Sequence, residues 1–321
     1  MVDVKLILSL LADNVERTGY PVPIDPRRIY SWAEPLKLPR RGRTVLYTGA
    51  LYQLVPYINS LVRHLESLER RKGGGLALKL AKTVSRVVDL GKIVAKADPG
   101  EVSTVEKVLK SIANLLSAAG VKYGYLYEND LYSGVLLYDM GLDEAFRRHA
   151  GKVAEALKRS GASLVITVDP HTTHVLRKVF PEYVEGFEFE VKSYLEVLAE
   201  KGGRLPVKAP SEPGYDVVLH DPCFYARHEG VIEQPRRLLA LAGLNVKDPA
   251  KSGRMTYCCG GPVEAISPSL SKRIAETRLD ELRAVGGRIV TMCPICYANL
   301  RRAGGEVEDI ALHLSRRLLG A

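Results

Sequence analysis

The sequence predicts an α/β protein with two domains. Short apolar segments with the composition of β-strands alternate along the chain with segments whose apolar residues recur every three or four positions. This alternation is typical of layered α/β folds. The chain has 321 residues, 46% of them hydrophobic, which is enough to build a substantial core and to divide into two domains.

Four segments have strand composition, and each lies just before a turn: residues 44–47, 163–168, 215–220 and 288–292. Helical periodicity separates them, for example in residues 146–160 and 270–285, and Ser267-Pro268 marks the start of the second of these helices. Residues 65–118 are rich in Lys, Ala, Leu and Val and are divided at Asp98-Pro99-Gly100. We expect them to form a helical insertion that either packs on its own domain or offers a surface to a partner.

All five cysteines lie in the last third of the chain: Cys223, Cys258, Cys259, Cys293 and Cys296. Thirty-four residues separate the first from the adjacent pair, so the cysteine groups lie on different loops that folding brings together. The Cys-x-x-Cys step lets two thiolates converge on one ligand across a turn, and Pro294 suits that turn by fixing φ. Neighbouring side chains diverge in an extended segment, so the adjacent pair fits different edges of a large ligand.

Two further observations favour a site at these loops. Gly260 and Gly261 follow the adjacent pair and allow close backbone approach, with N–H groups that can donate to cluster sulfurs. Cys223 and Cys293 each follow a predicted strand. Ligands of open α/β sheets lie beyond the carboxyl ends of the strands, which is where these two cysteines are expected.

Counting ligands leaves several chemistries open. A tetrahedral zinc needs four protein ligands and a cubane iron–sulfur cluster needs four thiolates, so one cysteine of the five is left over in either case. The cysteines could instead be small buried hydrophobes, or two disulfides with a spare thiol, although disulfides are rare in cytosolic proteins. The clustering favours a metal or a cluster.

The cysteines belong to a longer pattern, whose parts are His220-Asp221-Pro222-Cys223, Arg227, Gln234-Pro235-Arg236, Cys258-Cys259-Gly260-Gly261 and Cys293-Pro294-Ile295-Cys296. This pattern resembles the cysteine-rich CCG domain of the iron–sulfur subunits of heterodisulfide reductases and their relatives. The resemblance implies two such motifs in tandem, and two pseudo-repeated Rossmann-like lobes with short parallel sheets. Each lobe of this family can hold a noncubane [4Fe-4S] cluster through five cysteines.

The first motif of this chain departs from that pattern. Ala50 stands where the first cysteine is expected, Tyr132-Ser133-Gly134 replaces Cys-Cys-Gly, and Asp169-Pro170-His171-Thr172 replaces Cys-Pro-x-Cys. We therefore expect three parts: an N-terminal helical or linker segment at 1–42, a degenerate CCG lobe at 43–205 with the insertion at about 65–118, and a C-terminal CCG lobe at 206–321 that carries the cysteines.

The degenerate motif offers ligands of its own. Asp169, His171 and His174 have the side chains and short spacing that suit zinc or iron. We favour another role, in which Asp169, just ahead of Pro170, is the N-cap of the following helix.

The function that the resemblance implies is a redox subunit of a heterodisulfide reductase-like complex. One noncubane [4Fe-4S] cluster, held by all five cysteines with Gly260 and Gly261 beside it, would serve electron transfer to a disulfide or its reduction. The sequence has no ferredoxin-type cysteine run. Flavin-bearing or ferredoxin-type iron–sulfur subunits are therefore the expected partners. A small-molecule disulfide could be the substrate, but so could another thiol compound or a quinone-linked chain.

Two other functions compete with this one. The first is a non-catalytic assembly subunit of a redox complex, in which four of the cysteines hold zinc. The second is a metal-free dithiol oxidoreductase that uses Cys293 and Cys296, which leaves the other three cysteines without a role.

The charge balance and hydropathy exclude some classes. A formal net charge of +9 raises nucleic-acid binding, but the Lys and Arg residues are spread over the chain and no nucleic-acid motif accompanies them. Basic residues close to the cysteines could offset cluster charge: Arg227, His228, Arg254 and Lys272. No apolar run is long enough to span a membrane and no secretory signal is evident, so we expect a cytoplasmic protein, or one at the periphery of a membrane complex.

Overall fold

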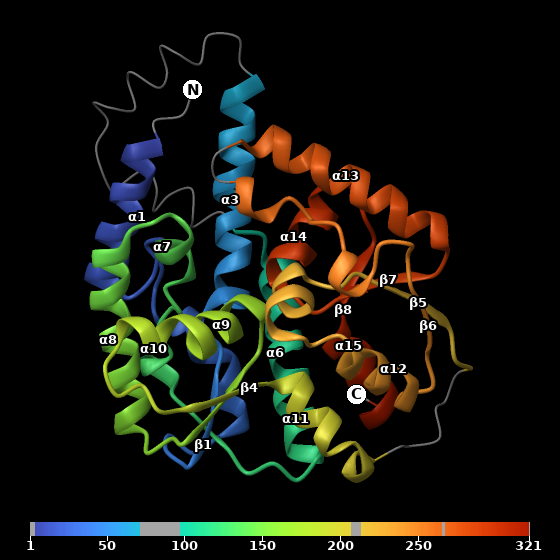
Figure 1. Cartoon of the computed structure of the whole chain (residues 1–321), viewed down its shortest axis with the longest axis horizontal. Helices are drawn as coiled ribbons and strands as arrows, with labels where there is room; N and C mark the ends of the chain where they lie inside the picture. Colours follow the sequence, from blue (N-terminus) through green and yellow to red (C-terminus); the bar gives the residue numbers. More distant parts are fainter. Residues whose placement is uncertain (1–3, 71–96, 207–212, 265–266, 321) are drawn as a thin grey trace.

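The computed structural model describes residues 4–70, 97–206, 213–264 and 267–320, which form two lobes side by side (Figure 1). Each lobe is built on a four-stranded parallel sheet flanked by helices. The strand order is β2-β1-β3-β4 in the first sheet and β6-β5-β7-β8 in the second, so the two lobes have the same topology. The predicted fold class, an α/β protein of two similar Rossmann-like lobes, is confirmed.

The first sheet consists of β1 (Thr44–Tyr47), β2 (Gly124–Tyr125), β3 (Leu164–Thr167) and β4 (Glu190–Ser193). Strand β1 lies in the middle and pairs in parallel with both β2 and β3, with Val45 opposite Val165. The inner strands are buried on both faces, which explains why they appear in the sequence as short continuous apolar runs.

Helices surround this sheet. Before β2 they are α1 (Val4–Thr18), α2 (Arg27–Tyr30), the 3₁₀ turn η1 (Ser31–Leu36), α3 (Leu51–Arg70) and α6 (Pro99–Ala118). After β2 they are η2 (Tyr127–Asn129), α7 (Val135–Asp139), α8 (Asp143–Arg159), α9 (Pro170–His174), the π-helical turn η3 (Val175–Val179), α10 (Phe180–Tyr183), α11 (Tyr194–Glu200) and η4 (Gly202–Arg204).

The second lobe repeats this arrangement on a smaller scale. Its strands are β5 (Asp216–Leu219), β6 (Asn245–Lys247), β7 (Arg288–Thr291) and β8 (Val307–Asp309), with Val218 opposite Ile289. Its helical segments are the π-helical turn η5 (Phe224–Glu229), α12 (Glu233–Leu241), the 3₁₀ turns η6 (Gly253–Met255) and η7 (Gly261–Val263), α13 (Pro268–Val285), α14 (Pro294–Arg302) and α15 (Ile310–Leu319).

Local backbone geometry supports an internal repeat. Gly134, which precedes α7, and Gly260, which precedes η7, have nearly the same left-handed conformation, with φ of 85° and 84° and ψ of 0° and 1°. Asp169 and Cys293 both stand in extended conformation at the N-cap of the helix after the third strand, and a proline follows each. The first lobe therefore retains the turns of the cysteine motif without its cysteines.

Helices α3 and α6 of the first lobe pack against helices of the second and join the two lobes (Figure 1). Helix α6 begins at Pro99 with Asp98 as its N-cap, and it buries a full apolar face that contains Val105, Leu109 and Ile112. The described part of the predicted insertion therefore packs within the protein. The rest of the predicted insertion, residues 71–96, lies outside the described residues.

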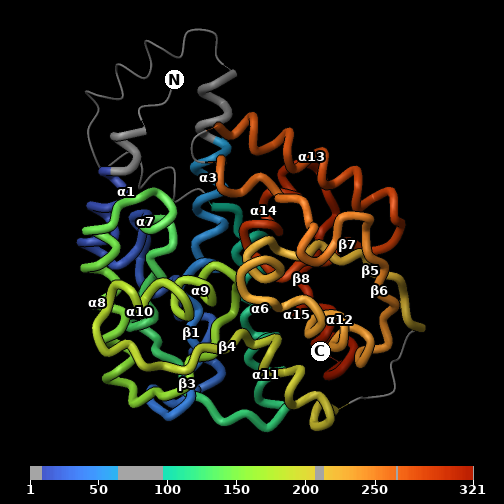
Figure 2. The backbone as a smooth tube through the Cα atoms, viewed as in Figure 1, coloured from blue at the N-terminus to red at the C-terminus, as the bar shows by residue number. Residues whose placement is uncertain are grey.

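The tube in Figure 2 follows the chain from the first lobe into the second, and α15 returns the C-terminal part of the chain to the side of α6. All strands of the first sheet fall within residues 44–193, and all strands of the second within 216–309. The predicted domain boundaries stay predictions. Within the described residues, none of the helices combines the length and apolar character that a membrane crossing requires.

Candidate functional site at the cysteine loops

The cysteines gather at the carboxyl edge of the second sheet, at the point where its strand order reverses. The chain leaves β5 toward β6 on one side, and it later returns to β7 on the other. Cys223 follows the end of β5 and Cys293 follows the end of β7, so the two flank this switch point. Ligands of open α/β sheets bind in the crevice at such a point.

The adjacent cysteine pair reaches the same place on the loop that follows β6. This loop is shaped by Gly260, whose φ of 84° an L residue rarely adopts and whose N–H donates to Cys258 Sγ at 3.3 Å. A Cβ on Gly261 would lie 2.4 Å from Ile295 Cγ2, so only glycine lets this loop approach the loop of Cys293 and Cys296. The two glycines thus allow the close backbone approach that the sequence predicts, and their role toward a cluster stays a prediction.

The structure brings together all five predicted cysteines, and all five are free thiols. Interactions between sulfurs run from Cys223 to Cys258, Cys258 to Cys259, Cys259 to Cys296 and Cys296 to Cys293. Cys259, Cys293 and Cys296 are buried, whereas Cys223 and Cys258 are partly exposed. The site therefore has a buried inner part and an outer edge that solvent reaches.

These contacts shift the pKa values of the thiols in opposite directions. Hydrogen bonds from Cys223 and Cys259 lower the pKa of Cys258, and the bond between Cys223 and Cys258 raises the pKa of Cys223. Burial raises the pKa of Cys293, but interactions with Cys296 and His171 outweigh it and lower the pKa overall. Five sulfurs cannot all be thiolates at such short range without positive charge between them, which is what a metal or a cluster supplies.

His220 adds a nitrogen to the sulfurs. Its ligand atom lies within 4.8 Å of the sulfurs of Cys259 and Cys296. The buried Arg278 donates from Nε to His220 Nδ1 at 3.1 Å, which places the imidazole proton on Nε2. Burial and then the charge of Arg278 lower the pKa of His220 to about 3, so the ring stays neutral.

The Nε2–H of His220 is buried and has no hydrogen-bond partner among the described residues. A donor beside the cysteine sulfurs suits an acceptor such as a cluster sulfur. The sequence shows His220 within the motif but does not reveal this role, because the role depends on Arg278, which lies 58 residues away along the chain.

Asp221 holds the loop that leads to the adjacent cysteines. Its carboxylate accepts from Arg236 at 2.8 and 2.9 Å and from the N–H of Gly253 at 2.7 Å. Its carbonyl accepts from the Thr256 hydroxyl at 2.9 Å. The Asp and Arg of the sequence motif thus position the cysteine loop without touching the sulfurs.

The basic residues that could offset cluster charge have other contacts. Arg227 donates to the carbonyls of Arg254 and Thr256, and Lys272 pairs with Glu276 at 3.8 Å. The ring of His228 lies against those of Phe224 and His174. None of these interactions joins a basic group to a cysteine sulfur.

The first lobe also reaches the site. Asp169 accepts from the N–H groups of His171 and Thr172, both at 2.9 Å, which confirms its predicted role as the N-cap of α9. The buried ring of His171 lies 4.3 Å from that of Phe224 and interacts with Cys293 of the other lobe. His174 instead bonds to Glu229 at 2.7 Å, so the structure does not bring the three predicted alternative ligands together around one point.

The position of the lost first motif keeps polar groups. The side chains of Ser133 and Thr172 converge on Gly49, where a Cβ would lie 3.0 Å or less from both. The hydroxyls of Ser133 and Thr172 and one carboxylate oxygen of Asp169 are buried and lack partners among the described residues. No cysteine stands there, so this position does not offer the ligands of a thiolate-bound cluster.

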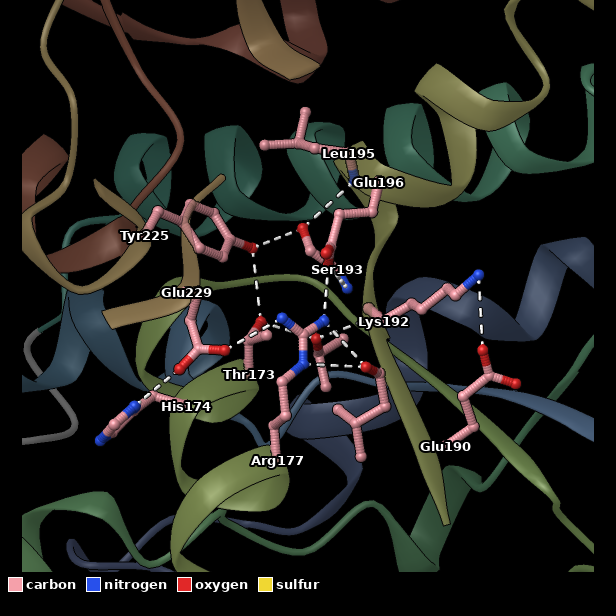
Figure 3. Close-up of polar contacts among 12 residues, drawn as sticks. Thr173, His174, Arg177, Glu190, Lys192, Ser193, Leu195, Glu196, Tyr225 and Glu229 are labelled. Atoms are coloured by element: carbon pink, nitrogen blue, oxygen red, sulfur yellow. Dashed lines mark hydrogen bonds and ion pairs between the residues drawn. The ribbon is translucent and has the colours of Figure 1, made fainter. Parts of the chain in front are cut away.

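A buried polar network fixes the cysteine loop to the first lobe (Figure 3). Glu229, at the end of η5, has a fully buried carboxylate that accepts from His174 at 2.7 Å and from Arg177 at 3.0 Å. The hydroxyl of Tyr225 lies 2.8 Å from that of Ser193. The helical turn after Cys223 is therefore held by residues of the first lobe.

The donor set fits a thiolate-bound group. Five free thiols from three loops meet at a switch point, two of them have lowered pKa values, and a buried imidazole N–H beside them lacks an acceptor among the residues described. Thiolates are ligands of zinc and of iron–sulfur clusters, and a set larger than four sulfurs exceeds what tetrahedral zinc requires.

Comparison with known proteins agrees with this site. Residues 217–301, which contain all five cysteines, match the family model of a cysteine-rich domain, CCG. The EtfAB:quinone oxidoreductase of Syntrophomonas wolfei is 32% identical over 202 residues, covering 60% of this chain and 28% of that protein. The resemblance predicted from the sequence is confirmed.

Two further relatives are similar over much of the chain. The probable iron-sulfur-binding oxidoreductase FadF of Bacillus subtilis is 29% identical over 67% of this chain and 32% of its own length. One subunit of the dihydromethanophenazine:CoB–CoM heterodisulfide reductase of Methanosarcina mazei is 31% identical over 59% of this chain and 48% of its own length. The matched part thus spans between about a quarter and a half of these relatives.

Proposed function

We propose that the chain is an iron–sulfur redox subunit of a heterodisulfide reductase-like complex, on the premise that residues 217–301, which match the family model of a cysteine-rich domain, CCG, form such a domain. The observation that carries the proposal is the meeting of five free cysteines at the switch point of the second sheet. The names of the relatives support it, since they describe an iron-sulfur-binding oxidoreductase and a component of a heterodisulfide reductase.

We propose further that the cofactor is one noncubane [4Fe-4S] cluster held by Cys223, Cys258, Cys259, Cys293 and Cys296. The adjacent pair supports this assignment, because both of its sulfurs interact with other cysteines of the site and neither is left outside it. When bound, the cluster supplies one-electron chemistry for electron transfer to a disulfide or for its reduction.

The residues around the sulfurs have distinct tasks in this proposal. The imidazole of His220 lies beside the sulfurs of Cys259 and Cys296 while Arg278 fixes its tautomer, and N–H donors beside a cluster tune its potential. The Gly260 N–H donates to Cys258. The inner cysteines are buried, and the ring of Phe224, which follows Cys223, lies against that of His171 from the first lobe.

We also propose partners that deliver electrons. The donors that we propose are flavin-bearing or ferredoxin-type iron–sulfur subunits, since the five cysteines of this sequence are all assigned to the one cluster. Membership of a redox complex is supported by the names of two relatives, an EtfAB:quinone oxidoreductase and a subunit of a heterodisulfide reductase.

A zinc-binding assembly subunit is the second candidate. One observation favours it: His220, Cys259 and Cys296 have ligand atoms within 4.8 Å of one another, and a fourth ligand from the neighbouring cysteines would complete a tetrahedral site. The hydrogen bond from Arg278 to His220 Nδ1 and the two cysteines left over weigh against it.

Single Cys→Ser variants, purified without oxygen, separate the two candidates. If all five cysteines hold the cluster, each variant lowers the iron content or changes the absorption and electron paramagnetic resonance spectra. If the group is zinc, at least one variant keeps its full metal content. Ser133→Ala, at the corresponding position of the first lobe, is the matched control and should leave the iron unchanged. A Cys258→Ser protein with full iron and an unaltered spectrum contradicts the five-ligand assignment.

A further inference from the structure

A cavity of about 500 Å³ lies between the two lobes and adjoins the cysteine loops. Its walls come from α1, α3 and α7 of the first lobe and from the segments 261–264 and 295–298 of the second. Gly261 and Ile295 bring the wall to the cysteine loops, because Gly261 follows Cys259 by two residues and Ile295 stands between Cys293 and Cys296. His171, which interacts with Cys293, also lines the cavity. A cavity of this volume is in the range of small-molecule sites.

The walls are mainly apolar. One face of α3 contributes Leu51, Val55, Ile58 and Val62, which recur at three- and four-residue spacing and so lie along one side of the helix. Met140 belongs to the facing wall. An apolar ligand gains free energy by leaving water for such a cavity, in proportion to the apolar area that it buries.

The charge of the walls selects against anions. Although the chain carries a formal net charge of +9, no Lys or Arg is among the described residues that line the cavity. Two carboxylates do line it, and that of Glu264 is paired with Arg302 at 3.3 Å. Asp139 contributes the other carboxyl group, and burial raises its pKa. The one imidazole among the described lining residues, that of His171, already interacts with Cys293, so an anionic ligand would lose its hydration here without an unoccupied cationic partner among these residues.

We propose that this cavity binds an uncharged, largely apolar small molecule, with one end against Gly261 and Ile295 beside the cysteine sulfurs. The inference deepens the proposed function and rests on it, because it names the substrate class of the same site. A ligand of this class carries no phosphate, sulfonate or carboxylate group. The binding step itself depends only on the cavity.

Two fluorescent probes with the same aromatic skeleton test the inference. N-phenyl-1-naphthylamine is uncharged, and 1-anilinonaphthalene-8-sulfonate carries one added sulfonate. Both probes are titrated into the anaerobically purified full-length protein. The uncharged probe should bind at one site per chain, and the affinity of the sulfonate probe should be lower by about tenfold or more. Equal affinity of the two probes overturns the charge selection.

Variants locate the binding. Ile58→Trp fills the cavity from α3 and should weaken binding of the uncharged probe about tenfold. Arg63→Gln, on the same helix but outside the cavity lining, should leave it unchanged. Leu136→Trp repeats the test from the facing wall if Ile58→Trp does not fold. Asp139→Asn should narrow the difference between the two probes. Unchanged binding in both Trp variants places the probe elsewhere and overturns the inference.

Metal content, measured on the same samples, separates this inference from the proposed function. Loss of probe binding with iron retained in a Trp variant supports the cavity as the site. A wild-type protein that contains iron and sulfide but does not bind the uncharged probe rejects the cavity and leaves the proposed function standing. A protein that binds the probe but contains zinc and no sulfide rejects the redox function alone.

Discussion

At the scale of single residues, the two lobes share the backbone geometry of the cysteine motif but differ in the side chains that it carries. Gly134 and Gly260 have the same left-handed conformation, yet Ser133 precedes the first and Cys259 precedes the second. The turn persists because a neighbouring group leaves no room for a side chain. At Gly260 that group is the carbonyl of Ser271, 2.5 Å from where a Cβ would lie.

Gly260→Ala should therefore destabilise the protein by about 2 kcal/mol or more, since it adds a strained φ to a clash with backbone. Gly151→Ala is the matched control, because Gly151 lies within α8 with open space around its Cα. It should gain about 0.5–1 kcal/mol. Anaerobic thermal unfolding followed by circular dichroism measures both. A Gly260→Ala protein as stable as wild type would contradict the strain argument.

The role of a single residue could not be predicted from the sequence where it depends on a residue far away along the chain. The cysteines and their glycines were predictable, because their chemistry is local and their spacing is visible in the sequence. The role of His220 was not, since it needs the buried Arg278. The same holds for His171, which meets Cys293 only because two lobes pack together.

Asp309 carries the pH dependence that is most open to test. Burial raises its pKa to about 7, although Tyr52 and the N–H of Ala311 donate to its carboxylate at 2.6 and 2.9 Å. Between pH 5 and 7 the unfolded chain has lost this proton, whereas the folded protein still holds it. Wild-type stability should therefore fall as the pH rises toward 7, by up to about 1.4 kcal/mol per pH unit, and this contribution should level off above 7.

Asp309→Asn cannot ionise at this position, so the difference in unfolding free energy between wild type and variant should follow that slope. Thermal unfolding of both proteins from pH 5 to 8 measures the difference. A difference that stays constant over this range is the opposing result, and it would mean that the carboxyl is ionised in the folded protein throughout.

At the scale of secondary-structure elements, burial decided which parts could be predicted. The strands β1, β3, β5 and β7 were predicted within one residue at each end, because buried strands of parallel sheets are continuous apolar runs. The other four strands, among them β2 (Gly124–Tyr125), were not predicted. They are two to four residues long and stand at the edges of the sheets, where no apolar run marks them.

Helix α9 provides the test of a predicted cap. Asp169→Ala removes the acceptor of two N–H groups and should cost about 1–2 kcal/mol. Asp169→Asn keeps an acceptor oxygen and removes a carboxyl whose pKa burial raises to about 6, so it should be at least as stable as wild type at neutral pH. Thermal unfolding separates the two. Equal damage from both substitutions would show that the negative charge itself is needed, as a bound cation would require.

At the scale of the whole molecule, the lobes form a single unit around the site. Tyr52 of α3 bonds to Asp309 of the second lobe, and Glu229 of the second lobe bonds to Arg177 of the first (Figure 3). The sequence indicated two lobes from its repeat. It could not show how they join, because the polar contacts between them are single residues without a pattern.

Glu229→Ala should destabilise the protein by about 2 kcal/mol, because it removes the fully buried carboxylate partner of His174 and leaves Arg177 with Glu196 as its remaining carboxylate partner. Glu190→Ala is the matched control: this carboxylate is 60% exposed, its partner is Lys192, and its loss should cost about 0.5 kcal/mol or less. Thermal unfolding compares the two. Similar small effects would mean that the lobes do not depend on the buried network.

The most direct test of the central claim is the iron, zinc and acid-labile sulfide content per chain of the protein purified without oxygen. A single cluster held by the five cysteines predicts about four iron and four sulfide per chain and no zinc. About one zinc without sulfide would contradict the claim and make the cysteines a structural metal site.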